Sequence, residues 1–305
     1  MTTSTALRPS VRAAFSALID YAGLFPPAKL PLVQARAEYE AARTGRQAWM
    51  LGRFIMPAAL LFESANDVDA ALSVIADAEV DVLERIAAMR RAGSRIEALE
   101  IPIAQSVSPL RTTLSSDEIL DITGELEADI ATVGLRDLPV YVEIPPVAPW
   151  WPMLPAVMSA LARMQLGAKL RCGGVTAEAF PSAHQVAEFI DAAARAGVAF
   201  KATAGLHHPV RHVDAATGFP MHGFLNILAA AALAPQLDRE TLVQVVAEED
   251  SATFSFGETS FAWRDRRVDL SELQQTRRER FNGYGSCSFT EPVEDLVALG
   301  VLPAQ

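Results

Sequence analysis

The feature that most constrains the fold is an alternation, repeated along the chain, of a short apolar run and a longer alanine-rich amphipathic segment. We predict strands at Leu51–Met56, Leu72–Asp77, Ile96–Ile103, Pro139–Ile144, Ala168–Cys172 and Val198–Thr203. Helical spacing lies between them, as in Asp117–Thr132, Trp151–Leu166 and Ser182–Ala196. Strands that alternate with helices of this length indicate βαβ units and a parallel sheet.

Length and hydrophobicity favour a single barrel. The chain has 305 residues, of which 50% are hydrophobic, and a (β/α)8 TIM-like barrel commonly takes ~250 residues. We predict one domain over residues 1–305, with 1–45 as an N-terminal helical extension and 46–305 as the barrel. An open doubly wound sheet is the alternative architecture.

The last third of the chain leaves the final strands open. Thr253–Phe256 is a candidate seventh strand, although with Phe261–Trp263 it could equally form an excursion hairpin. Tyr284–Phe289 would then be the eighth strand, and Pro292–Leu299 the closing helix. In an alternative register, Ser16–Tyr21 is itself the first strand.

Charge and cysteine content exclude several classes of protein. A net charge of −11 argues against a nucleic-acid-binding surface. The sequence contains no run of about eighteen apolar residues, so we predict no membrane span. The two cysteines, Cys172 and Cys287, have no paired spacing, which fits a reducing compartment and predicts a cytoplasmic protein.

Alternation within four strands gives each an apolar face and an opposite face that carries ionisable side chains. The residues on this second face are Ala98 and Glu100, Tyr141 and Glu143, Lys169 and Arg171, and Lys201 and Thr203. A barrel turns this face inward, toward the strand ends where active sites lie. Only three of the 26 basic residues are lysines, so a lysine inside an apolar strand indicates a specific role.

The charged members of this face are predicted to converge near one mouth of the barrel. They are Glu100, Glu143, Lys169, Arg171 and Lys201. Burying such charges singly costs several kcal/mol, so they pair with each other or bind a charged ligand. A purely structural layer of salt bridges and a catalytic site both remain open at this stage.

The catalytic hypothesis is a carbon–carbon lyase of the aldolase type that acts on a small carbonyl or carboxylate metabolite. Lys201 would form a Schiff base, and Lys169 beside it would lower its pKa. Glu143 or Glu100 would move protons to and from the carbinolamine, and Arg171 would hold an anionic substrate. This chemistry predicts no cofactor.

The segment around Lys201 resembles a known enzyme family. Phe200-Lys201-Ala202-Thr203-Ala204-Gly205 is similar to the strand-borne Lys-x-x-x-Gly segment of deoxyribose-phosphate-type class I aldolases. In that family the matching lysine carries the Schiff base on the sixth barrel strand, which is the position of Lys201 in the register above. The family's later Gly-Gly phosphate-binding strand has no counterpart here, since Gly173-Gly174 follows the preceding strand.

The chain also resembles an uncharacterised bacterial barrel family. The resemblance lies in the segments Asp20–Ala28, Gly205–Pro209 and Gly285–Phe289. It implies the barrel fold and says nothing about an activity.

The histidines support a different chemistry. Four of the five fall between His207 and His222. His207 or His208, together with Glu143, could hold a divalent Zn, Mn or Fe ion for a metal-dependent lyase, isomerase or hydrolase. Surface or loop histidines without a metal are the alternative.

Further polar residues are candidates for binding substrate. Tyr141 and Thr203 share the inner face, and Asp20 begins a loop that could present it to the mouth. Ser286 lies in a glycine-rich run ahead of a helix, where it could hold a phosphate or form a cap. A third possibility is a non-catalytic barrel that binds a small molecule or assembles with partners. The predicted partners are a small-molecule substrate and further copies of the chain in a homo-oligomer, without nucleic acid or membrane.

Overall fold

Eight parallel strands close into a barrel in the order β1-β13-β7-β6-β5-β4-β3-β2. The computed structural model describes residues 7–64, 69–108, 110–174, 176–215 and 217–303. The barrel strands are β1 (Ile19–Tyr21), β2 (Leu51–Pro57), β3 (Leu72–Ile75), β4 (Ile96–Pro102), β5 (Val140–Ile144), β6 (Gly167–Arg171), β7 (Phe200–Thr203) and β13 (Phe281–Ser286). The predicted (β/α)8 barrel is therefore confirmed.

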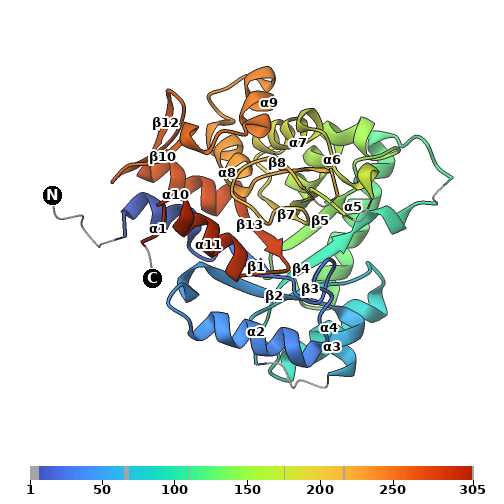
Figure 1. Ribbon diagram of the computed structural model, residues 1–305. Coiled ribbons are helices and arrows are strands. Elements are labelled where there is room, and N and C mark those ends of the chain that lie inside the picture. The colour runs from blue at the N-terminus through green and yellow to red at the C-terminus, as the bar shows by residue number, and fades with distance from the viewer. Residues whose placement is uncertain (1–6, 65–68, 109, 175, 216, 304–305) are drawn as a thin grey trace.

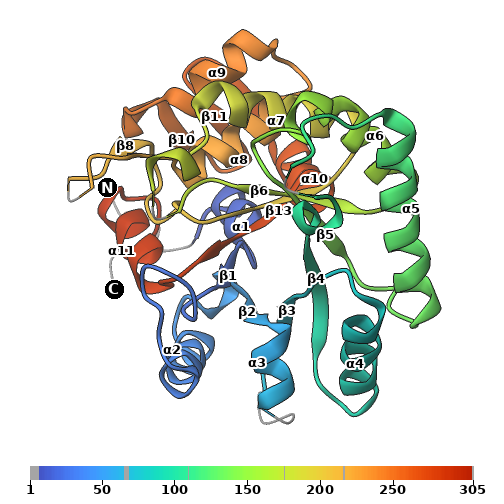
Figure 2. The same cartoon turned by 90° about the vertical axis from the view of Figure 1, so that its right-hand side faces the viewer.

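A helix follows each barrel strand and covers the outside of the sheet. These helices are α2 (Leu32–Thr44), α3 (Ala58–Glu63), α4 (Val80–Arg91), α5 (Ser116–Thr132), α6 (Leu154–Arg163), α7 (Ala183–Ala196), α8 (Phe224–Leu233) and α11 (Thr290–Ala298). Figure 2 shows α2 to α7 arranged around the strands. Capping boxes at Ser115 and Ser182 satisfy the first amides of α5 and α7.

A helix, a hairpin and a longer insertion lie outside the repeating strand–helix pattern of the barrel. Helix α1 (Pro9–Phe15) precedes β1, and a hairpin of β8 (His212–Val213) and β9 (Pro220–Met221) lies between β7 and α8. An insertion between α8 and β13 contains α9 (Arg239–Ala247), the antiparallel sheet of β10 (Phe254–Phe256), β11 (Ser260–Trp263) and β12 (Arg266–Asp269), and α10 (Leu270–Glu279). Helix α1 packs against α10 (Figure 1).

The alternative register is the one observed. Ile19–Tyr21 pairs with both β2 and β13, so it is the first strand and the barrel begins within the segment predicted as an extension. Phe254–Phe256 is not a barrel strand, because it pairs antiparallel with β11 across a three-residue connection too short for a parallel crossover. The strand that carries Lys201 is consequently the seventh and not the sixth.

Helix α8 anchors the insertion to the barrel. All ten of its residues are buried, as expected for a helix that is apolar on every side. Its one polar side chain, Asn226, donates to the carbonyls of Val245 and Glu248 at 2.9 Å each and accepts from the Arg211 amide. Within the described residues, no helix is long and apolar enough to cross a membrane.

Candidate functional site

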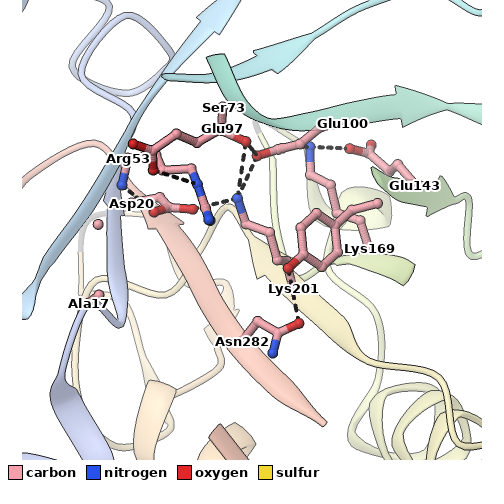
Figure 3. A network of polar contacts seen from close by, with 12 residues as sticks. Ala17, Asp20, Arg53, Ser73, Glu97, Glu100, Glu143, Lys169, Lys201 and Asn282 are labelled. Atoms are coloured by element: carbon pink, nitrogen blue, oxygen red, sulfur yellow. Dashed lines mark hydrogen bonds and ion pairs between the residues drawn. The ribbon is translucent and has the colours of Figure 1, made fainter. Parts of the chain in front are cut away.

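Charged side chains of alternating sign form a continuous chain through the barrel interior. Lys201 Nζ lies 2.5 Å from Asp20 Oδ2 and 2.6 Å from Glu100 Oε1. Lys169 Nζ lies 2.7 Å from Glu100 Oε2 and 2.8 Å from Glu143 Oε2. Figure 3 shows these five side chains next to one another, with Glu100 between the two lysines.

Arg171 extends the chain by one further charge. Its Nη1 lies 3.5 Å from Glu143 Oε1. The complete series is Asp20, Lys201, Glu100, Lys169, Glu143 and Arg171. Three carboxylates thus alternate with three cations, so the buried charges are compensated within the series.

Strand alternation brings these side chains to the barrel axis, as the sequence predicts. Lys169 is in register with Glu143 on β5 and with Lys201 on β7. Gly167 provides space beside them, because a Cβ there would lie 2.8 Å from the Tyr141 ring. That ring packs under the cluster, with its centroid 5.4 Å from Lys201 Nζ.

Burial and pairing act in opposite directions on the pKa values of this cluster. Burial alone would raise the pKa of Glu100, but the Lys169 and Lys201 ammonium groups outweigh it and hold that pKa well below its usual range. Burial alone would lower the lysine pKa values. Glu100 with Glu143 raises that of Lys169, and Asp20 with Glu100 raises that of Lys201. Both lysines are therefore ammonium groups at neutral pH.

This result corrects the expected electrostatics of Lys201. Lys169 was predicted to lower its pKa, but Glu100 lies between the two ammonium groups and accepts from both sides. Asp20 at 2.5 Å and Glu100 at 2.6 Å together stabilise the charged form of Lys201 and outweigh the effect of burial on its pKa. The prediction of a lowered Lys201 pKa is wrong for this arrangement.

The two ends of the charge chain face opposite mouths of the barrel. Glu143 and Arg171 lie at the carboxyl ends of β5 and β6, with side chains 17% and 48% exposed. Asp20 lies at the other end, where it accepts from the Arg53 amide at 2.6 Å. Lys169 is therefore the lysine nearer the carboxyl-terminal mouth, and Lys201 the lysine nearer the amino-terminal mouth.

The remaining predicted substrate-binding residues take different places. Thr203 is half-buried on β7 in register with Arg171 at the carboxyl end. Tyr141 is buried, and its hydroxyl donates to Asn282 Oδ1 at 3.0 Å. Ser286 is buried at the end of β13, and its Oγ accepts from the Ser288 amide at 3.4 Å.

The two histidines predicted as metal ligands pair with helix α11. His207 Nδ1 lies 3.2 Å from Glu291 Oε2, and His208 Nδ1 lies 2.6 Å from Asp295 Oδ2. Burial lowers the pKa of His207. In the part of the chain that the structure describes, no group of three or more His, Cys, Asp or Glu residues is placed to hold a metal ion. The metal site stays a prediction.

The sequence patterns above did not single out two residues that lie beside the charge chain, Ser73 and Arg53. Ser73 Oγ donates to Glu100 Oε1 at 2.6 Å, and Arg53 Nε lies 3.6 Å from Glu97 Oε2. Each is a lone polar residue inside an apolar strand, Leu72–Ile75 and Leu51–Pro57 respectively. The same alternation that singled out Glu100 would have found both.

Comparisons with known proteins give a likeness in structure but none in sequence family. No protein-family model and no curated protein matches the sequence. Among solved structures, the chain is similar to a deoxyribose phosphate aldolase from Aeropyrum pernix, described as having a unique tetrameric structure. The match has a TM-score of 0.44 and 13% identity, and covers 66% of this chain and 80% of the other. A likeness at this level adds nothing to the barrel that the strand order already establishes.

Proposed function

We propose that the protein is an enzyme that forms a Schiff base between Lys169 and a small carbonyl metabolite at the carboxyl-terminal mouth. The observation that supports this most is the position of Lys169: it is buried, and its second carboxylate, Glu143, reaches solvent at that mouth. Active sites of this fold lie at the carboxyl ends of the strands. Lys201 lies deeper, between Asp20 and Glu100.

The strand count favours the same lysine. In class I aldolases of the deoxyribose-phosphate type, which the Lys201 segment resembles, the Schiff-base lysine lies on the sixth strand. In this barrel the sixth strand is β6, which carries Lys169, and Lys201 lies on β7. The proposed nucleophile therefore moves from Lys201 to Lys169.

Glu143 is the proton acceptor in the proposed chemistry. The Lys169 ammonium gives a proton to Glu143 at 2.8 Å, and the freed lone pair attacks the substrate carbonyl carbon. The nitrogen of the adduct passes one proton to the alkoxide oxygen, which gives the carbinolamine. The carbinolamine hydroxyl then takes the proton back from Glu143 and leaves as water. The iminium that remains draws electrons from the adjacent carbon, so that a bond to that carbon is cleaved or formed.

Lys201 and Arg171 have supporting roles in this scheme. Lys201 stays an ammonium ion and holds Glu100 ionised, so that Glu100 stabilises the cationic iminium on Lys169. Arg171, the exposed member of the chain, is placed to pair with a carboxylate or phosphate group of the substrate.

Reductive trapping tests the proposal. The protein is incubated with a panel of small aldehydes and 2-keto acids, reduced with sodium borohydride, digested and mapped by mass spectrometry. We expect a reduced adduct on the peptide that contains Lys169, lost in Lys169→Arg. Lys29→Arg is the matched control, because Lys29 is exposed and is the one lysine of the sequence besides Lys169 and Lys201.

Two outcomes would contradict the proposal. The first is the absence of an adduct with every compound of the panel. The second is an adduct that maps to Lys201 and persists in Lys169→Arg, which would return the nucleophile to the seventh strand.

A further inference from the structure

The amino-terminal mouth lies on the opposite side of the barrel from the proposed Schiff-base chemistry. A cavity of about 1010 Å³ opens there between α1, α10 and the first residues of β2, β4 and β13. Asp20 and Tyr141 both line it. The cavity therefore reaches two side chains that contact Lys201.

Arginine dominates the charge of this cavity. The basic residues that line it are Arg12, Arg53, Arg95, Arg277 and Arg278. The lining carboxylates are Asp20, which is paired with Lys201, and Glu97, which lies 3.1 Å from Arg95 Nη2 and 3.6 Å from Arg53 Nε. Five guanidinium groups against two carboxylates make the cavity strongly positive, although the whole chain carries a net charge of −11.

One hydrogen-bond donor in the cavity wall is left unused. Arg277 donates through Nη1 to the Phe281 carbonyl and through Nη2 to the Ser16 carbonyl. Its Nε is buried and has no hydrogen-bond partner among the described residues. A buried donor without a partner costs about 1–3 kcal/mol, so this one calls for an explanation in function. Arg53 Nε makes only a long contact, 3.6 Å from Glu97 Oε2.

Among the described residues, the Arg277 guanidinium is held by main-chain carbonyls and by no carboxylate. It donates to the carbonyls of Phe281, Ser16 and Ala17. Burial lowers its pKa to about 10, which leaves it charged at neutral pH. A half-buried cation that is anchored to the backbone and offers a free Nε donor is suited to a planar anion, since guanidinium groups bind carboxylate and phosphate oxygens in pairs.

We propose that this cavity binds a small metabolite that carries two or more carboxylate or phosphate groups. The volume is at the upper end of the range for small-molecule sites, roughly 300–1,000 Å³. Arg53 and Arg277 line the wall, and the exposed Arg12, Arg95 and Arg278 surround the entrance. Binding here requires no step of the Schiff-base proposal, because neither Lys169 nor Glu143 lines the cavity.

Isothermal titration calorimetry with defined anions tests the site. Citrate and pyrophosphate are the probes, and glycerol is the neutral control. We expect saturable binding of at least one anion and none of glycerol. Losing one charged hydrogen-bond partner corresponds to about a tenfold or greater loss of affinity, which we expect for Arg53→Gln and Arg278→Gln. Affinity should also fall as salt is added.

The controls separate the site from general charge effects. Arg267→Gln removes an exposed arginine on β12 that does not line the cavity, and it should bind as tightly as the wild type. Arg277→Gln removes bonds to main-chain carbonyls and could unfold the protein, so the conclusion depends on the other two variants. Absence of binding by the wild type, or equal affinity in Arg53→Gln, Arg278→Gln and the wild type, would overturn the proposal.

Discussion

Replacing Glu100 by glutamine tests the charge chain at its centre. Glu100 is 1% exposed, and its two oxygens contact Lys169 and Lys201. Glutamine has almost the same shape but no charge, so Glu100→Gln leaves two carboxylates to balance three cations. The variant therefore buries one uncompensated positive charge without creating a cavity.

The expected loss of stability follows from this excess charge. Removing one partner of a buried ion pair costs about 3–5 kcal/mol. The entropy of unfolding is roughly 2.1 cal/mol/K per residue, which for 305 residues gives roughly 0.64 kcal/mol per kelvin. We therefore expect the Tm to fall by about 5–8 °C.

Calorimetry and urea unfolding measure this difference directly. Glu40→Gln is the matched control, since it breaks a pair with Arg43 in which both side chains are about half exposed. Exposed pairs contribute roughly 0.2–1 kcal/mol, so the control should lie close to the wild type. A Glu100→Gln variant as stable as the control would refute the conclusion that Glu100 compensates both lysines.

Four further results are expected. The pKa of folded Glu100 lies below its ordinary value of 4.5, so its contribution is fully present above pH 4.5 and is lost as the pH falls below it. The stability difference between wild type and Glu100→Gln, followed by urea unfolding across pH, should therefore shrink in acid. The pKa of folded Lys201 lies above 10.5, so its contribution is present below pH 10.5 and lost as the pH rises through the folded value; a Lys201→Met variant should show its full destabilisation at neutral pH. Asn226→Ala removes the side-chain partner of the Glu248 carbonyl and of the Arg211 amide and should cost about 2–4 kcal/mol in the same assay. Under the Schiff-base proposal, protein purified without added ions should hold no stoichiometric transition metal; one equivalent lost in His207→Ala would favour the metal-dependent alternative.

Local sequence patterns predicted most of the barrel. The apolar runs at β2 to β7 are long enough to be found by periodicity, and the alternation within them placed Glu100, Glu143, Lys169 and Lys201 on the inner face. The first strand is harder to find, because Ile19–Tyr21 has only three residues. It is defined by pairing with β2 and β13, residues distant in sequence, which no local pattern contains.

The electrostatics of the site could not be predicted for a similar reason. Sequence alternation shows that Lys169 and Lys201 share a face but not what lies between them. Glu100 reaches both from β4, two strands away from β6. The direction of both lysine pKa shifts depends on that three-dimensional contact. The cavity at the amino-terminal mouth likewise combines residues from α1, β2 and α10, which are far apart in the chain.

The protonation state of Lys169 and Lys201 is the property on which the charge chain depends most directly. Because the chain has only three lysines, side-chain ¹⁵N NMR resolves each Nζ, and Lys29→Arg assigns the exposed one. We predict that the two buried ammonium signals persist as the pH is raised past 10.5, the ordinary lysine pKa. Titration of either signal near neutral pH would show a lowered pKa and contradict the alternating chain.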